Sequence, residues 1–218
     1  MSKIADLAYQ TIRDRIISGD YQSGTHLKEE QVAQDIGASR TPVREALRRL
    51  NAEQLVEFAP NRGAYVTSWS LEDVEEIYTL RSILEGQAAF RAATRIADSE
   101  IQVLIECANR IDNLLSDIDE RNTTKIFEAN HRFHNTILDA SKSERLSKML
   151  SWLVEIPLTL QTFEKYSSRD IERSNHHHRE LIDAFLSRDP HWAQQVMETH
   201  LSAAQRLFAF KRKESTHS

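Results

Sequence analysis

The chain has 218 residues, of which only five are glycine and four are proline, so turn-forming residues are scarce. This scarcity disfavours folds that need a turn every ~8–12 residues, such as β-sandwiches and barrels, and excludes collagen-like and Pro/Gly-rich disordered chains. A mostly helical fold is expected. The net charge of −5 argues against a uniformly basic nucleic-acid binder, and the single cysteine, Cys107, excludes an internal disulfide.

The first two predicted elements are helices. Apolar residues recur at helical spacing from about Ile4 to Ser18, and Gly19 follows as a residue that ends a helix. After a polar loop, the apolar positions from Leu27 to Ile36 predict a second, short helix.

A third helix and a β-hairpin are expected next. Ser39 or Thr41 can cap the helix, and Pro42 lies in its first turn, where a missing N–H is tolerated. Beyond this helix, residues 55–58 and 64–67 are short β-type runs separated by a Pro-Asn-Arg-Gly turn signal. Three helices followed by a hairpin is the element order of a winged helix-turn-helix.

The rest of the chain predicts helices only. Ser70 opens a long helix, so we place a domain boundary between residues 69 and 70, with a helical domain at 70–211 and a tail at 212–218. Pro157 is expected to kink the fourth of the six helices. The predicted helices span residues 71–96, 99–119, 122–140, 143–167, 170–187 and 190–211.

The charge is unevenly distributed along the chain. Residues 1–70 are neutral and residues 71–218 carry the whole excess of −5, while residues 38–50 carry +3. Within that basic stretch Arg40, Arg44 and Arg48 are four residues apart, so they share one helix face. A small basic patch on an otherwise acidic chain favours a local DNA-reading surface.

The third helix is the expected DNA-reading element. A winged helix-turn-helix places this helix in the major groove, where the planar fork of arginine can bind guanine or phosphate. Ser39 and Thr41 can donate to phosphate, and Arg62 beside Gly63 at the hairpin tip suits a backbone or minor-groove contact. The alternative is an ordinary solvated face in which the arginines pair with Glu45 and Glu53.

Histidines in the helical domain form a second candidate site. Asn130 and His134 are four residues apart on one helix, and His178 and His200 lie on the last two helices. Side chains from three helices converging on one point are a usual way to hold Zn²⁺ or a related ion. The alternative is a set of hydrogen-bonded polar residues in the bundle interior. Three further histidines, His131, His176 and His177, are expected to face solvent.

Two segments of the predicted winged helix-turn-helix resemble a known family. The sequence SRTPVREALRRL at residues 39–50 resembles the recognition-helix signature of the GntR superfamily of bacterial transcription regulators, and PNRGAYV at residues 60–66 resembles its wing. The resemblance implies that Arg40, Thr41, Arg44 and Gly63 contact DNA. Exposure and charge, rather than the resemblance, add Arg48 and Arg62, and the position at the helix start adds Ser39.

The helical domain resembles the FCD effector domain of the FadR subfamily, and six helices favour its VanR-type branch. The resemblance implies a small carboxylate effector and a metal held by Asn130, His134, His178 and His200, which would also contact the effector. Arg81 falls where related domains meet the effector's carboxylate, although an ion pair with Glu85 is the alternative. The matching segments are RSILE at 81–85, NHRFH at 130–134, HRELIDA at 178–184 and METHL at 197–201.

One metal ligand departs from the family pattern. Asn130 stands where the family commonly has aspartate, and a neutral amide oxygen is a weaker ligand than a carboxylate. Zn²⁺ or Ni²⁺ bound mainly through three imidazoles is the expected cofactor, and an effector bound without any metal is the alternative.

The sequence therefore predicts a ligand-responsive bacterial transcription regulator rather than an enzyme. It is expected to be a cytoplasmic homodimer without a membrane segment that binds an inverted repeat in double-stranded operator DNA. One alternative is a metal-dependent helical-bundle enzyme, since Glu128 and His131 form one Glu-x-x-His element, although a di-iron site needs two. A protein-interaction module is the other alternative.

Overall fold

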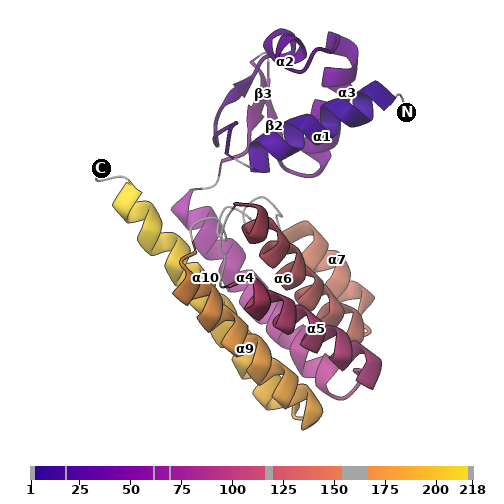
Figure 1. The fold of residues 1–218 in the computed structure, drawn as a ribbon, viewed down its shortest axis with the longest axis vertical. Helices are drawn as coiled ribbons and strands as arrows, with labels where there is room; N and C mark the ends of the chain where they lie inside the picture. The colour runs from indigo at the N-terminus through magenta and orange to yellow at the C-terminus, as the bar shows by residue number, and fades with distance from the viewer. Residues whose placement is uncertain are drawn as a thin grey trace. The chain divides into compact units, whose positions relative to one another are not determined.

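The computed structural model describes residues 3–17, 19–60, 62–68, 70–115, 120–153 and 166–215 (Figure 1). The chain divides into two compact units, Met1–Ser70 and Leu71–Ser218. The first contains three helices and a small antiparallel sheet, and the described part of the second contains helices alone. The predicted fold class is thereby confirmed.

The N-terminal unit is built around one hydrophobic core. Its sheet has the order β1-β3-β2, with both pairs antiparallel. Ile12 from the first helix and Leu47 and Leu50 from the third are fully buried beneath it. The elements are α1 (Lys3–Ile17), β1 (His26–Leu27), α2 (Glu29–Asp35), α3 (Arg40–Ala52), β2 (Val56–Ala59) and β3 (Gly63–Val66).

The strand β1 corrects the prediction that the second helix starts at Leu27. Leu27 is extended and pairs with Ala64, while His26 pairs with Tyr65, and α2 begins only at Glu29. A two-residue strand is too short to show a period of two in the sequence. The burial of Leu27 fits a strand as well as a helix, so its apolar character did not distinguish the two.

The third helix has the two faces that its sequence predicts. Val43, Ala46, Leu47 and Leu50 are buried and form the face toward the core. Ser39 occupies the N-cap position, but its side chain makes no capping hydrogen bond. The opposite face of α3 is therefore presented outward from the unit.

The C-terminal unit is a helical bundle in which α4 and α10 pack along each other (Figure 1). The helix α5 packs on both α6 and α9, and Cys107 in α5 is buried as a core residue. No helix in the described part of the chain is long and apolar enough to cross a membrane. The elements are α4 (Leu71–Ala93), α5 (Asp98–Leu114), α6 (Glu120–Ala140), α7 (Glu144–Leu153), α9 (Ser168–Leu186) and α10 (Pro190–Ser215).

Several helix ends differ from the predicted ones. The helix α5 ends at Leu114, and α10 extends to Ser215, past the predicted end at residue 211. The predicted continuation of α7 over residues 154–165, with its kink at Pro157, lies outside the described residues. The predicted end at residue 167 is wrong, because Ser167 is extended and is the N-cap of α9. The start of α10 is as predicted, because the carboxylate of Asp189 accepts hydrogen bonds from the backbone N–H groups of His191 and Trp192, each at 3.0 Å.

The helices α4 and α10 approach each other closely at Gly86. A Cβ atom at this position would lie 2.9 Å from Cγ of Glu198 and 3.0 Å from its Oε1. Real Cβ atoms do not come this near to a neighbour, so the absence of a side chain permits the close crossing.

Candidate functional site

Two exposed arginines of α3, Arg40 and Arg44, contact the carboxylate of Glu29 in α2. Arg44 binds Glu29 in a bidentate manner, with 2.8 Å from Nε to Oε1 and 2.7 Å from Nη2 to Oε2. Nη2 of Arg40 lies 3.3 Å from the same Oε2. The side chains of Arg40 and Arg44 remain 61% and 51% exposed, so both are accessible to a ligand. Arg48 is also exposed.

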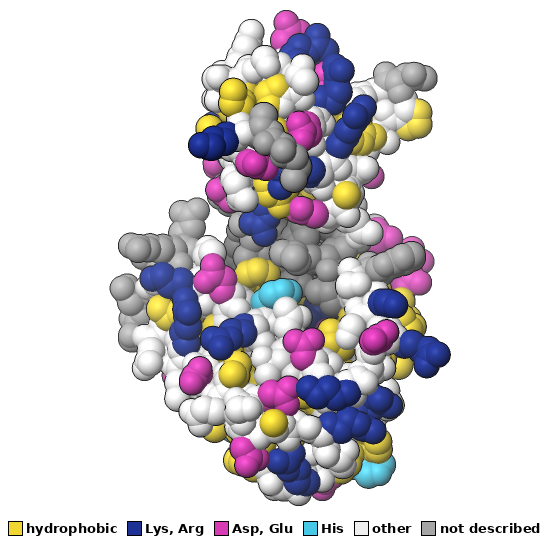
Figure 2. Space-filling model, turned by 90° about the vertical axis from the view of Figure 1, so that its right-hand side faces the viewer, with side chains coloured by type: hydrophobic (Ala, Val, Ile, Leu, Met, Phe, Trp, Pro, Cys, Tyr) yellow, Lys and Arg dark blue, Asp and Glu magenta, His cyan; other side chains and the backbone are white. Residues whose placement is uncertain are grey.

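The alternative interpretation paired these arginines with Glu45 and Glu53, and the contacts of Arg40 and Arg44 with Glu29 differ from it. The carboxylate of Glu53 instead accepts from the hydroxyl of Tyr9, at 2.8 and 2.9 Å. The hydrogen bonds from Arg44 hold the pKa of Glu29 below its ordinary value, although partial burial opposes them. On the face shown in Figure 2, basic and acidic side chains are interspersed over both units, so no broad field of one sign covers that face.

The wing lies at the edge of the same unit. Gly63 has a φ of +93°, and a Cβ atom there would lie 2.9 Å from Nε2 of His26. The ring of His26 stacks on Tyr65 with 4.5 Å between the centroids. Glycine at position 63 therefore serves both the backbone conformation and the packing of β1 against β3. Arg62 and Thr41 are exposed, as is Ser39.

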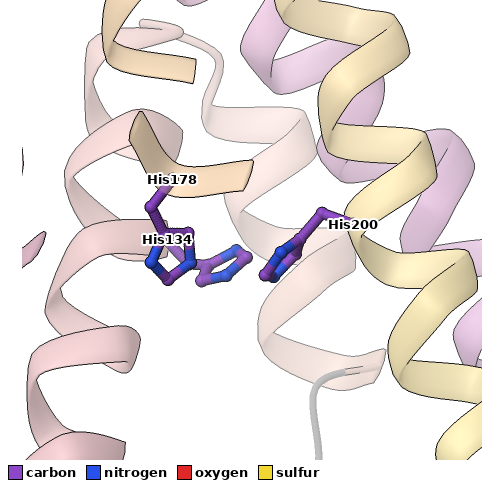
Figure 3. Close-up of side chains that lie close together, drawn as sticks. All are labelled: His134, His178 and His200. Carbon is purple, nitrogen blue, oxygen red and sulfur yellow. The ribbon is translucent and has the colours of Figure 1, made fainter. Parts of the chain in front are cut away.

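In the C-terminal unit, the structure brings three histidines from three helices together. His134 on α6, His178 on α9 and His200 on α10 each offer a ring nitrogen, and these atoms all lie within 4.8 Å of one another. The three rings point toward a common centre (Figure 3). Such a spacing allows one ion to contact all three imidazoles after small side-chain movements.

The protonation of His178 is set by a neighbouring amide. The Nδ2 group of Asn175 donates to the carbonyl of Ala108 at 3.0 Å and to Oδ1 of Asp112 at 2.6 Å. Its Oδ1 therefore faces Nδ1 of His178, 3.2 Å away, and can only accept. His178 must then carry its proton on Nδ1, which leaves a lone pair on Nε2.

A carboxylate orients the ring of His134 in a similar way. Nδ1 of His134 lies 2.7 Å from Oε2 of Glu85, while Nε of Arg81 donates to Oε1 of Glu85 at 2.8 Å. Burial by itself raises the pKa of Glu85, but the charge of Arg81 and the contacts with His134 outweigh it, so this pKa lies far below its usual range. Carboxylate-oriented histidines are the usual ligands of protein-bound transition metals.

Three buried polar atoms at this centre have no hydrogen-bond partner among the described residues. They are Oδ1 of Asn130, Nε2 of His178 and Nδ1 of His200. Burial, reinforced by the neighbouring histidines, also lowers the pKa values of His178 and His200 well below the ordinary value, so both imidazoles are neutral at pH 7. Neutral, unpartnered imidazoles are the form that binds a metal, so the donor set fits Zn²⁺ or Ni²⁺.

A cavity of about 290 Å³ adjoins the centre. Its polar wall includes Arg81 and the predicted site residues of α6, and its apolar wall comes from α4, α6, α7 and α10. Its lining residues are Arg81, Glu85, Ala88, Asn130, His131, His134, Asn135, Ile137, Leu138, Ser147, Leu150, Ser151 and Met197.

Two histidines lie in surroundings that differ from the predicted ones, and two hydrogen-bond partners at the centre were not predicted. His131 and His177 are partly buried rather than facing solvent, because the helices that carry them have neighbours on more than one side. His176 is exposed, as predicted. Glu85 appeared in the sequence only as an ion-pair partner of Arg81, and Asn175 carried no recognisable signal.

Comparison with known proteins decides the family. Residues 4–66 match the model of bacterial regulatory proteins of the gntR family, and residues 76–203, more than half of the chain, match the FCD domain. The chain belongs to the GntR family of regulators with an FCD domain. It is therefore a DNA-binding transcription regulator and not an enzyme.

Individual relatives agree with this assignment. The GntR/FCD regulator is 24% identical over 194 residues to the HTH-type transcriptional regulator YdhC of Bacillus subtilis, covering 89% of this chain and 86% of that protein. It is 28% identical over 196 residues to the gluconate operon transcriptional repressor of the same species, covering 84% and 75%.

Solved structures share the fold of this GntR/FCD regulator. Escherichia coli McbR/YncC superposes with a TM-score of 0.73 at 20% identity, covering 99% of this chain and 100% of that one. A GntR regulator from Rhodococcus sp. RHA1 gives a TM-score of 0.73 at 22% identity, covering 95% and 99%. At these identities the likeness concerns the fold alone.

The Glu-x-x-His element, on which the alternative of a metal-dependent enzyme was based, does not form part of the histidine centre. Glu128 of the Glu-x-x-His element is 61% exposed and lies 3.7 Å from Arg110, so it points toward solvent. It does not share the buried centre with His134.

Proposed function

We propose that this regulator binds an inverted repeat in operator DNA as a homodimer, with α3 in the major groove and the wing beside it. A single recognition helix contacts too few base pairs for tight and specific binding, which supports a dimer. Two such helices are expected about 34 Å apart, one turn of DNA. The proposed DNA-contact residues are Ser39, Arg40, Thr41, Arg44 and Arg48 of α3 and its start, with Arg62 and Gly63 of the wing.

We further propose that the histidine centre holds Zn²⁺ or Ni²⁺ and, through it, part of a carboxylate effector. The proposed ligands are His134, His178, His200 and Asn130. The single observation that carries this proposal is the convergence of three imidazoles, those of His178 and His200 buried and that of His134 partly buried. In His134 and His178 the other ring nitrogen is already paired. A bound metal would supply a Lewis-acidic position for an anionic oxygen.

The cavity beside the centre limits the effector. A volume of about 290 Å³ admits only a small molecule, and Arg81 on its wall offers positive charge to a carboxylate. The paired Glu85 neutralises part of that charge, so the effector must compete with it or share Arg81. One relative is the repressor of a gluconate operon, and gluconate is a small carboxylate of this kind.

Regulation then follows from population shift. The effector changes DNA binding only if it binds one conformation of the dimer better than another. We propose that α4 transmits this preference, because it begins at the boundary of the two units and carries Arg81 and Glu85. Membership of the VanR-type branch stays a prediction, because residues 154–165 lie outside the described part of the chain.

Elemental analysis tests the metal. Protein purified without a nickel column should contain about one Zn or Ni per chain, and Zn²⁺ or Ni²⁺ added after chelation should raise its melting temperature. A His134→Ala, His178→Ala double variant is the matched control, and it should show neither effect. Metal-free protein whose melting temperature does not respond to either ion would contradict the proposal.

A separate experiment tests the DNA and effector roles. Duplexes selected by the protein from a randomised library should contain an inverted repeat, and footprinting should protect two half-sites one helical turn apart. Small carboxylates, added singly, should change the affinity for that duplex in the wild type but not in the His134→Ala, His178→Ala variant. Selection of a single unrepeated site would contradict the dimer model.

A further inference from the structure

We propose that Glu29 of α2 is a positioning residue for DNA readout, which orients Arg44 and Arg40 before DNA arrives. Three contacts support this role: two from Arg44 at 2.8 and 2.7 Å, and one from Arg40 at 3.3 Å. Glu29 is only 24% exposed, whereas both arginines are at least half exposed. The carboxylate is thus the fixed part of the cluster, and the guanidinium groups are its accessible part.

The geometry of the bidentate contact leaves a specific part of Arg44 open to a ligand. Glu29 occupies the lateral side of the guanidinium, formed by Nε and Nη2. The terminal side, formed by Nη1 and Nη2, carries further N–H donors. Two donors on that side match the O6 and N7 acceptors of guanine in the major groove. Glu29 therefore holds Arg44 by one side and leaves the base-reading side available.

Orientation of this kind favours specificity. A free arginine loses side-chain entropy when it is fixed on a base, and Glu29 has already removed part of that freedom. Glu29 also lies against two arginines four residues apart, so it offsets their mutual repulsion. Its negative charge weakens the attraction to phosphate, which every DNA sequence offers equally. The result is a higher ratio of specific to non-specific affinity.

Two substitutions in the same turn of α2 separate positioning from simple charge. Glu29→Gln and Glu30→Gln each remove one negative charge, but the structure shows ion pairs with Arg40 and Arg44 for Glu29 and none with them for Glu30. The probes are the best duplex selected by the wild-type protein from a randomised library, and poly(dI-dC). Both dissociation constants are measured at several salt concentrations with the full-length chain.

We expect Glu29→Gln to lower the ratio of specific to non-specific affinity by about tenfold, while Glu30→Gln leaves it within about twofold. Glu29→Asp, which keeps the charge but shortens the reach, should also lower the ratio. In an Arg44→Ala background, Glu29→Gln should have much less further effect on the ratio, because the shared contact is already lost.

Two outcomes would contradict a positioning role for Glu29. If Glu29→Gln tightens binding to both probes and keeps the ratio, as Glu30→Gln is expected to do, Glu29 acts only as an opposing charge and the proposal is wrong. The same conclusion follows if Glu29→Asp behaves as the wild type. Circular dichroism and melting temperature identify any variant that loses the fold, and the remaining variants then decide the question.

Discussion

The Nδ1 atom of His134 lies 2.7 Å from Oε2 of Glu85, and the other oxygen of that carboxylate accepts from Arg81 at 2.8 Å. One buried carboxylate therefore joins the histidine centre to the arginine on the cavity wall. A change at Arg81 therefore alters the charge that Glu85 presents to His134, and a change at His134 alters the charge that it presents to Arg81.

The first prediction concerns the stability of this network. Glu85→Gln leaves Arg81 as a buried cation without a full counter-charge, and breaking such a pair costs about 3–5 kcal/mol. Urea unfolding followed by circular dichroism should show this loss in the C-terminal unit. Glu128→Gln, at a mostly exposed ion pair, should change stability by no more than about 0.5 kcal/mol. Equal losses in the two variants would rule out the network as a source of stability.

The second prediction concerns metal affinity. Asn130→Asp replaces an unpartnered amide oxygen with a carboxylate, so affinity for Zn²⁺ or Ni²⁺ should rise on the order of tenfold. Competition with a chromophoric chelator measures the change. Asn135→Asp adds the same charge to the same helix, beside His131, and should have a much smaller effect. An equal rise in both variants would show that general charge, and not ligation, is responsible.

The third prediction concerns the DNA interface. Arg44→Ala should weaken binding to the selected duplex about 5- to 150-fold, with a shallower salt dependence if the contact is to phosphate. Arg49→Ala removes the same charge from the same helix, but Arg49 lies over the ring of Tyr9 at 3.9 Å and 2.7 Å from Asp6. Its effect should be small. Unchanged binding of Arg44→Ala in a gel-shift assay would remove this residue from the interface.

The fourth prediction concerns the wing. Gly63→Ala requires both an unfavourable φ and the displacement of His26, whereas Gly24→Ala meets only the unfavourable φ, with no atom within 4 Å. The backbone effect alone is about 1–2 kcal/mol, so Gly63→Ala should destabilise the N-terminal unit by more than Gly24→Ala does. Melting temperatures of the two variants test the order, and the reverse order would contradict the close packing of His26 on Gly63.

The fifth prediction concerns pH. Because Arg44 lowers the pKa of Glu29 below 4.5 in the folded chain, the contact stabilises the N-terminal unit above the unfolded pKa. That contribution is lost as the pH falls below about 4.5 and through the folded pKa. An NMR titration of the Glu29 carboxyl carbon should give a lowered pKa in the wild type and a value nearer 4.5 in Arg44→Ala. Identical values would show that the ion pair does not persist in solution.

Much of this architecture can be predicted from sequence, because it depends on periodicity and on turn residues. The apolar stripe from Val43 to Leu50 predicted both the helix and its buried face. The spacing of Asn130 and His134, and the resemblance that joined them to His178 and His200, predicted the centre that three helices now form.

What the sequence did not predict are contacts between residues far apart in the chain. Glu29 is fifteen positions from Arg44, and Glu85 is forty-nine from His134, so no local pattern links them. Asn175 matters through the direction of its amide group, which only packed neighbours determine. The strand at His26 and Leu27 is a pairing with β3, and pairing partners are not visible in a two-residue segment.

The glycine at position 86 has a mechanical consequence. Glu85, one residue before it, belongs to the network with Arg81 and His134, while Glu198 blocks the space on the α10 side. A side chain at position 86 would require Glu198 to move or the two helices to separate. The network that holds Arg81 and His134 therefore lies directly beside a position where a side chain larger than hydrogen would meet Glu198 of α10.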